Sequence, residues 1–417
     1  MVWVVLIFSF IVFPIHAYGH GFANYAQGQK AFALGGAFTA AADDPSAIFY
    51  NPSGILKLKD VQVQTGLTYF FSGNAEFVSN GTSNIPGSKN GLITKTDSEN
   101  HVIPYAYATC KINDTFSMGL GIYSPFGQSS RWPDNWEGRF TTAGIESSIE
   151  SYRVEPVAVF SPTPGVSISF GAFFQKVELE IKQKSWLPGE FESILDGRDS
   201  GVGWSTGILI DITDNFSLGV SYKSRIKHEF NSMTVNLEPE IPLLGISDTT
   251  ANMKFTTPSM LFMGISYSFR KWNFSFDTYW TEWSVQDRLI ARSDNVLLGD
   301  TVVIKNWENT LTFGLGIQYA FSEKFHLFAG YIYDQSPVPA ETLDAMVFHG
   351  DSQVYCTGFD FTYKSFVIGI TYGYIVANDQ PFNNPVGDTS NPGGGRVTGI
   401  FENSTQNVVS ISMKFMF

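Results

Sequence analysis

Residues 408–417 read VVSISMKFMF, and this stretch decides the fold because its two sets of alternate side chains differ in character. Successive side chains of an extended strand point to opposite faces, so a period of two is typical of a β-strand between two different environments. The segment therefore predicts a strand that runs to the last residue. One face carries Val409, Ile411, Met413, Phe415 and Phe417, and the other carries Val408, Ser410, Ser412, Lys414 and Met416.

The same alternation recurs upstream. Residues 310–321, TLTFGLGIQYAF, place Leu, Phe, Ile and Tyr on one face and Thr, Gly, Gln and Ala on the other, and 216–223, 259–269 and 366–374 are similar. A soluble sandwich would carry Lys and Glu on its second face, whereas here that face is small and polar. Such a face is typical of the lining of a filled or narrow lumen, and it predicts an all-β transmembrane barrel.

Composition narrows the alternatives. The 417 residues carry a net charge of −13, with 16% charged, 43% hydrophobic and 15% aromatic residues. An acidic chain is a poor partner for nucleic acid, and so many aromatic residues argue against disorder. Two Cys exclude a disulfide scaffold and a four-Cys zinc site.

The connections between strands alternate in length. About 14 strands are expected over 61–417, antiparallel and closed into a barrel, with short turns at one end and long loops at the other. Outer-membrane barrels show this asymmetry, with short periplasmic turns and long extracellular loops. The short turns are 113–114, 163–165, 213–215, 270–271, 322–324 and 364–365, and the long segments are 72–100, 124–144, 184–200, 231–256, 291–306, 335–352 and 378–403.

Both ends of the chain agree with export to the bacterial outer membrane. Residues 2–15 form an apolar block of signal-peptide length, and Ala17-Tyr18-Gly19 resembles a cleavage site, so 1–19 is expected to be a signal peptide. A buried N-terminal strand is the alternative. The terminal Phe417 is similar to the signal that barrel-assembly machinery reads, which makes that machinery an expected partner.

Residues 20–60 break the strand pattern. They are rich in Ala and Gly, with small residues around 34–37, and small side chains permit close packing inside another structure. We therefore expect a compact hatch that plugs the lumen.

The sequence of this hatch and of later segments resembles the FadL/TodX family of outer-membrane transporters for long-chain fatty acids and aromatic hydrocarbons. The resemblance covers nearly the whole mature chain, and the family fold is a 14-stranded barrel with an N-terminal hatch. The matching motifs are Gly21-Phe22, Gly28-x-x-Ala31, 35–38 (GGAF), 42–44 (ADD), 50–54 (YNPSG), 123–127 (YSPFG), 136–140 (WEGRF), 280–284 (WTEWS) and 330–339 (GYIYDQSPVP).

The resemblance implies passive uptake of a hydrophobic ligand with lateral release into the bilayer at a kink in the third strand. An open aqueous pore would help little, because an apolar chain loses roughly 0.8 kcal/mol per CH₂ on returning to water. Gly119 and Gly121 are the candidate kink residues, and the alternative is that they only make room for the hatch. The hatch residues Asn51, Pro52 and Ser53 would lie near the kink and help to gate it.

A carboxylate ligand would need a cation in an apolar setting. By resemblance, Lys305 and Lys182 match the family's basic positions, with Lys184 as an alternative for the latter, and Arg139 is a further candidate. Each lysine could instead be solvated or paired across strands. Phe22, at the start of the hatch, is expected to supply an apolar contact.

Other signals are set aside. Residues 203–207 fit G-x-S-x-G around Ser205, but they lie in an alternating strand without a following helix, so no enzyme is expected. Asp43-Asp44 could hold a metal but more simply caps a turn, and neither metal nor cofactor is expected.

The rival functions are a general porin, a barrel phospholipase and a surface receptor or adhesin. Lipopolysaccharide is an expected neighbour, a monomer is the expected state, and fatty acid, alkane and aromatic ligands stay open.

Overall fold

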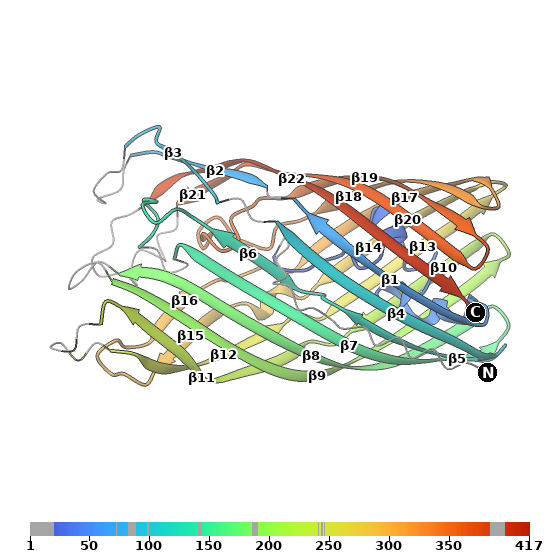
Figure 1. Cartoon of the computed structure of the whole chain (residues 1–417), viewed down its shortest axis with the longest axis horizontal. Helices are drawn as coiled ribbons and strands as arrows, with labels where there is room; N and C mark the ends of the chain where they lie inside the picture. Colours follow the sequence, from blue (N-terminus) through green and yellow to red (C-terminus); the bar gives the residue numbers. More distant parts are fainter. Residues whose placement is uncertain are drawn as a thin grey trace.

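A computed structural model describes residues 21–417, apart from residues 72, 241 and 246 and the segments 82–88, 98–99, 141–143, 186–190, 243–244 and 384–396. The predicted signal peptide lies outside the described residues. The chain forms one long antiparallel β-barrel whose strands run obliquely along its axis (Figure 1). Within the described residues no helix has the length and apolar character needed to cross a membrane.

The wall has 14 strands in the described part of the chain, made from 22 segments. Six wall strands are continuous: β7 (Glu146–Thr163), β8 (Val166–Ser185), β9 (Phe191–Thr213), β18 (Phe325–Asp334), β19 (Ser352–Tyr363) and β22 (Thr398–Met416). The others are divided in two: β1 (Val61–Phe70) with β2 (Asn74–Ser79), β3 (Ile93–Lys95) with β4 (His101–Asn113), β5 (Phe116–Tyr123) with β6 (Gly127–Arg131), β10 (Phe216–Lys223) with β11 (Ile226–Glu238), β12 (Thr249–Thr257) with β13 (Met260–Phe269), β14 (Trp272–Thr281) with β15 (Arg288–Ser293), β16 (Thr301–Ile304) with β17 (Thr310–Ser322), and β20 (Phe366–Ala377) with β21 (Gln380–Asn383).

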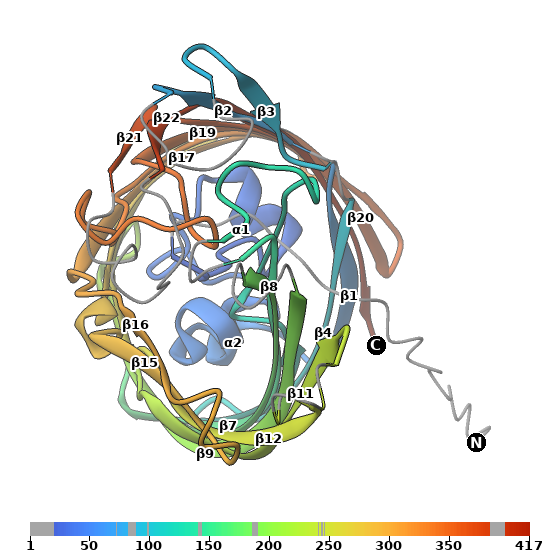
Figure 2. The ribbon, with the colours of Figure 1, turned by 90° about the vertical axis from the view of Figure 1, so that its left-hand side faces the viewer.

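The barrel closes between its first and last strands. β1 pairs with β4 on one side and with β22 on the other, so that Leu67 lies opposite both Pro104 and Ile411. Closure gives the strands partners on both sides, which is what lets a sheet stand in lipid without an open edge. Figure 2 shows the resulting ring end-on.

The outward face of the wall explains the alternation in the sequence. Exposed large apolar side chains lie at alternate positions along the strands, and several aromatic residues gather beside the short turns, as in the interfacial girdles of membrane barrels. On β8 the outward positions change from Phe170 and Phe174 to Lys176, Glu178 and Lys182. The wall beyond Lys176 therefore rises above the hydrocarbon, on the side of the long loops. The aromatic residues beside the turns are Phe269, Trp272, Phe321, Tyr363, Phe366 and Phe417.

The hatch fills the ring. Its elements are α1 (Gln29–Ala33), α2 (Ala47–Tyr50) and the 3₁₀ helix η1 (Pro52–Lys57), all inside the barrel in Figure 2. A further 3₁₀ helix, η3 (Trp283–Val285), follows β14 in the wall. Gly35 shows why the hatch is rich in small residues: its φ is +62°, and an added Cβ would lie 2.6 Å from the backbone N and O atoms of Tyr331.

Polar groups tie the hatch to the wall. Asp277 of β14 accepts hydrogen bonds from the backbone N–H groups of Phe38 (2.9 Å) and Thr39 (2.7 Å). Within the hatch, Asp43 pairs with Lys30 at 2.7 Å, and Asp44 accepts from the backbone N–H of Ser46 at 2.8 Å. Both carboxylates of the acidic pair thus contact groups of the hatch, and no cluster of three or more metal-ligand residues occurs among the described residues.

Candidate ligand-binding site and gate

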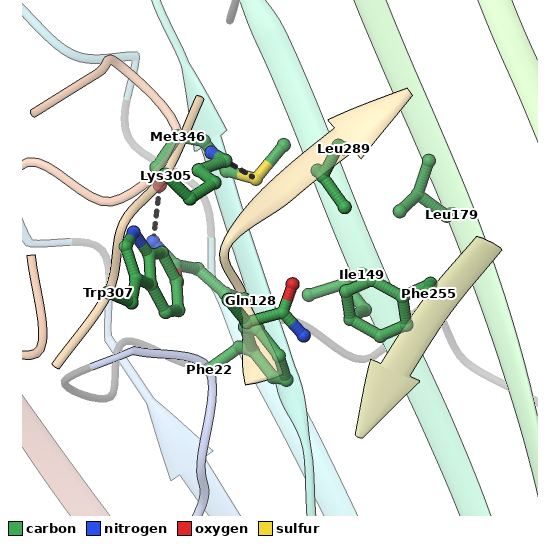
Figure 3. A pocket seen from close by; sticks show the side chains of 10 residues that line it. Phe22, Gln128, Ile149, Leu179, Phe255, Leu289, Lys305, Trp307 and Met346 are labelled. Atoms are coloured by element: carbon green, nitrogen blue, oxygen red, sulfur yellow. Dashed lines mark hydrogen bonds between the residues drawn. The ribbon is translucent and has the colours of Figure 1, made fainter. Parts of the chain in front are cut away.

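An apolar cavity lies above the hatch, within the upper barrel. It is a space of about 20 Å³, which is room for about one water molecule, so an acyl chain can occupy it only if some lining side chains move. Figure 3 shows that the cavity draws on the hatch, several wall strands and a loop. The lining residues are Phe22, Gln128, Ile149, Leu179, Phe255, Gln286, Leu289, Lys305, Trp307 and Met346.

Phe22 lies at the centre of an aromatic cluster. Its ring centroid is 4.6 Å from that of Trp283, 5.4 Å from Phe255, 5.7 Å from Phe126 and 5.8 Å from Trp307. The aromatic contacts hold this first described stretch of the hatch at the cavity. The structure therefore places the predicted Phe22 at the cavity, and its contact with a ligand stays a prediction.

Lys305 supplies positive charge to the same cavity. It follows β16 and is buried, and its Nζ lies 2.5 Å from the Asp344 carboxylate and 3.8 Å from Met346 Sδ. The indole N–H of Trp307 also faces a buried setting and has no hydrogen-bond partner among the described residues. An ammonium at an apolar cavity is suited to a carboxylate.

The loop between β18 and β19 covers this cavity. Residues 342–348 of the loop are mostly buried, although they lie at the extracellular end of the barrel. Ser130 of β6 donates a hydrogen bond to the Ala345 carbonyl oxygen at 2.8 Å, and the Gln128 side-chain amide donates to the Met346 carbonyl oxygen. The loop carries Asp344 and Met346, so its position determines both the free charge of Lys305 and the size of the cavity.

The hatch also binds the interruption in the third wall strand. This strand is divided between β5 and β6 at residues 124–126, and Pro125 there cannot donate a strand hydrogen bond. Instead, the Asn24 N–H donates to the Pro125 carbonyl oxygen at 2.9 Å and the Gly127 N–H donates to the Phe22 carbonyl oxygen at 2.8 Å. Phe22, which lines the cavity, is thus hydrogen-bonded to Gly127 at the break in the third wall strand.

The predicted kink residues lie just before this break. Gly119 and Gly121 are within the regular part of β5, paired with β4 on one side and β7 on the other. An added Cβ at Gly119 would lie 2.8 Å from Ile48 Cδ1, and one at Gly121 would lie 2.9 Å from Ile48 Cγ2. In this structure both glycines make room for the hatch, and the strand is interrupted at 124–126 instead.

The predicted hatch-gate residues contact a different part of the wall. The Asn51 amide donates to the carbonyl oxygens of Thr39 (2.9 Å) and Ile208 of β9 (3.1 Å). Pro52 begins η1, and the Ser53 hydroxyl donates to Ser169 Oγ of β8 at 2.9 Å. These residues anchor the hatch on β8 and β9, while neighbouring Ile48 reaches β5; their role in gating stays a prediction.

Lys182 and Arg139 lie away from the cavity. Lys182 is on the outward face of β8, above the hydrocarbon, and is 2.8 Å from Glu192; that hydrogen bond raises the pKa of the Lys182 ammonium. Arg139, in the loop after β6, donates to the Trp136 carbonyl oxygen at 3.0 Å and stacks 4.3 Å from the Phe140 ring centre. The structure does not bring either residue to Lys305, and their proposed ligand contacts stay predictions.

A second group of buried cationic side chains was not predicted from the sequence as a site. Arg153 of β7 stacks 3.8 Å from the Phe173 ring centre, and its Nε and Nη2 donate to Gln175, while Nη1 has no partner among the described residues. Glu155 accepts from Lys223 Nζ at 2.7 Å. With Arg153, Glu155 and Lys223 ionised, this buried cluster holds one net positive charge. The inward parity of Ile149, Arg153 and Glu155 on one strand is the sequence signal that could have indicated it.

Ser205 completes this cluster rather than an enzyme's nucleophilic site. Its hydroxyl donates to Glu155 Oε1 at 2.5 Å, and it lies in continuous β9, without the strand-turn-helix that a nucleophile elbow needs. Cys110 and Cys356 are both free thiols, as expected from the distance between their strands.

Comparison with known proteins adds an independent result. Residues 15–417 match the profile of a family described as "Outer membrane protein transport protein (OMPP1/FadL/TodX)". A putative outer membrane protein of Neisseria meningitidis serogroup B is 27% identical over 426 residues, covering 90% of this chain and 89% of its own length. The long-chain fatty acid transport protein of Escherichia coli O6:H1 is 22% identical over 338 residues, covering 72% of this chain and 74% of its own length.

The fold has a close counterpart among solved structures. The crystal structure of a Pseudomonas aeruginosa FadL homologue matches with a TM-score of 0.81 at 20% sequence identity, covering 95% of this chain and all of the other (100%). At this identity the likeness concerns the fold: the closed barrel and the hatch within it.

Proposed function

This chain belongs to the OMPP1/FadL/TodX family of outer membrane transport proteins, and we propose that its cargo is a long-chain fatty acid or a similar apolar carboxylic acid. The family assignment confirms the resemblance read from the sequence and the outer-membrane location, and the closed antiparallel barrel of 14 strands matches the fold of the solved relative. The family consists of transport channels for hydrophobic compounds, not enzymes.

One observation carries the choice of a carboxylic acid. Lys305 is a buried ammonium at the edge of a cavity whose walls are otherwise mainly apolar. Although Asp344 pairs with this lysine, a buried ion pair often contributes no more stability than apolar side chains of similar volume, so a site for a plain hydrocarbon would gain nothing from it. The name of the Escherichia coli relative, a long-chain fatty acid transport protein, agrees with this choice.

The proposed mechanism is displacement. The ligand carboxylate replaces Asp344 at Lys305 Nζ, and the acyl chain takes the space of Phe22 and Met346. Movement of Phe22 then pulls on the hydrogen bonds that join 22–24 to 125–127, which frees the break in the third wall strand. The ligand leaves sideways through that break into the bilayer, because its acyl chain is more stable in lipid than in the periplasm.

Arg153 offers the carboxylate a second binding position between the cavity and the break in the third wall strand. It faces inward on β7 four residues beyond the cavity-lining Ile149, roughly 13 Å along the strand. Its ring neighbour Phe126 lies in the strand break and also contacts Phe22. A carboxylate released from Lys305 would therefore meet this cation, with its free Nη1, close to the exit.

Calorimetry on the purified barrel in detergent tests the proposal. Binding of a long-chain fatty acid is compared with that of the alcohol of equal chain length, in the wild type, Lys305→Met and Phe22→Ala. We expect Lys305→Met to weaken only acid binding, by about tenfold (~1.4 kcal/mol), and Phe22→Ala to change both ligands alike. Equal affinities for acid and alcohol in the wild type, unchanged in Lys305→Met, would reject a carboxylic acid as the cargo.

A further inference from the structure

The ladder between β9 and its neighbour has a gap. Pairing of β9 with β10 runs from Thr213↔Phe216 to Ser205↔Lys223, and pairing with the continuation β11 resumes only at Asp196↔Thr234. On its other side β9 is paired with β8 without interruption, from Val166↔Ile210 to Ser185↔Phe191. Residues 197–203 of β9 therefore belong to the wall through one ladder only. β9 and β11 run along the lower edge of Figure 1.

Side chains close this gap in place of strand pairing. The inward positions of β9 here include Gly197, Gly201 and Gly203, which leave the strand almost bare toward the lumen. An added Cβ at Gly201 would lie 2.3 Å from Ile226 Cγ2, and one at Gly197 would lie 2.5 Å from Met233 Cγ. Ile226 and Met233 of β11 therefore lie directly over the glycine backbone.

A single polar pair joins the two edges in the middle of the gap. Asp199 Oδ2 is 3.0 Å from His228 Nδ1 and accepts from the Glu229 N–H at 3.2 Å. His228 is completely buried, and its Nε2 has no hydrogen-bond partner among the described residues. A buried ring nitrogen without a partner is costly, so this contact is not a fully satisfied part of the core.

Apolar residues lie on both the lipid side and the lumen side of the gap, as a passage for an apolar ligand requires. Outside, Val202 and Trp204 are 71% and 53% exposed and lie at the level of the lipid-facing Phe174, since Val202 pairs with Phe174. Inside, Val177, Phe230 and Met233 belong to the same apolar cluster as Leu179, Phe255 and Phe22 of the cavity. Buried apolar side chains in contact with one another thus extend from the gap to the cavity.

We propose that the gap between β9 and β11 is a second lateral portal, latched by Asp199 and His228, through which an apolar acid already dissolved in the outer leaflet reaches the cavity. The inference rests on the proposed function for its ligand, but it concerns a different part of the wall from the break at 124–126. The gap lies across the upper edge of the hydrocarbon, since Val202 pairs with Phe174 and Asp199 with Val177, and irregular backbone there is tolerated where protein covers it, as Ile226 and Met233 do here. Opening requires only that the latch separate and that Ile226 and Met233 turn away, because β9 stays held by β8.

A reversible cross-link tests the portal. Asp199→Cys/His228→Cys is introduced into a background with Cys110→Ser and Cys356→Ser, reconstituted in nanodiscs and closed with a short bis-methanethiosulfonate. Stopped-flow fluorescence then follows a pyrene-labelled long-chain fatty acid, dissolved beforehand in the nanodisc lipid, as it reaches the cavity. We expect the closed form to load at least fivefold more slowly at unchanged equilibrium affinity, and reduction to restore the rate.

Glu178→Cys/Arg198→Cys is the matched control, because these residues lie opposite each other in the intact ladder between β8 and β9. Its cross-link should leave the rate unchanged. A closed Asp199→Cys/His228→Cys form that loads at the wild-type rate overturns the portal, while fatty acid binding itself survives. Absence of binding in every variant, wild type included, instead overturns the proposed function.

A single substitution decides the question if the double variant does not fold. Ile226→Ala empties the space over Gly201 and should speed loading severalfold, whereas Ser200→Ala on the outward face should not. Identical loading rates for Ile226→Ala and wild type overturn the portal.

Discussion

Lys305 already has an anion beside it, and this pairing sets how strongly the cavity attracts a carboxylate. Asp344 and Lys305 are both almost fully buried and their charged atoms are 2.5 Å apart. Asp344→Asn keeps the shape of the loop but removes the competing charge, so we expect fatty acid affinity to rise about tenfold (~1.4 kcal/mol). Titration calorimetry measures it, and the matching fatty alcohol, which cannot use the freed ammonium, serves as control. A rise of equal size for acid and alcohol would show that the loop had merely loosened.

At the same scale, the structure brings some of the residues named from the sequence together and not others, for identifiable reasons. Phe22 and Lys305 line one cavity, and their contact with a ligand stays a prediction. Lys182 lies on the outward face because Val177, Leu179 and Ile181, in alternate positions before it, take the inward face of β8. This alternation is visible in the sequence, so the outward position of Lys182 could have been predicted. The pairing of Arg153 with Gln175 was not, because it depends on the register between β7 and β8, which no local pattern fixes.

Among the elements, α2 fits against β5 through glycines, and this fit can be tested. A methyl group at Gly121 would lie 2.9 Å from Ile48 Cγ2 and 3.2 Å from Tyr107, so Gly121→Ala overpacks the seat of the hatch. We expect a loss of about 1–3 kcal/mol in stability. Thermal unfolding in detergent measures it. Ile48→Ala in the same chain should recover much of the loss, and a double-mutant cycle in which the two changes simply add would contradict the proposed contact.

The break between β5 and β6 should respond to ligand. Ser124 is buried, and its carbonyl oxygen accepts hydrogen bonds from the side-chain amides of Asn24 (3.2 Å) and Gln27 (2.5 Å). Displacement of Phe22 should loosen these bonds. In a background without native cysteines, we expect Ser124→Cys to react with a lipid-soluble maleimide severalfold faster once fatty acid is bound. Ser117→Cys, buried in the regular part of β5, is the control and should not respond. Equal reactivity of Ser124→Cys with and without ligand would show that ligand binding in the cavity does not loosen the break between β5 and β6.

The sequence predicted the strands better than their interruptions. Most of β12 (Thr249–Thr257) lies in the segment 231–256 that was expected to be a long loop, and Pro258 separates it from β13. Pro125 separates β5 from β6 in the same way. Since Pro lacks the N–H that a ladder needs, each proline was a local signal for a break. What fills a break, such as the pairing of 22–24 with 125–127, depends on contacts between distant segments and could not be read locally.

For the whole molecule, the wall and the hatch are held in place by different contacts. The wall closes through the pairing of β1, which directly follows the hatch in sequence, with β22, and no hatch residue takes part in that ladder. The alternation of small polar and large apolar positions was therefore enough to predict the barrel. The path of the hatch could be predicted only as a compact plug, because it follows from many small contacts with inward glycines such as Gly314 and Gly330.

Removal of residues 21–60 tests this division and separates a plugged transporter from a general porin. The barrel should still form, since strand pairing provides its closure, and it should retain the gel shift on heating that is usual for folded barrels. Its lumen, now lined by small polar side chains and by Asp277 without its hatch donors, should fill with water. We expect stable single-channel ion conductance in planar bilayers for the truncated chain and none of comparable size for the intact chain under the same conditions. Equal conductance from both would mean that the hatch does not obstruct the lumen, and the intact barrel would then function as a porin.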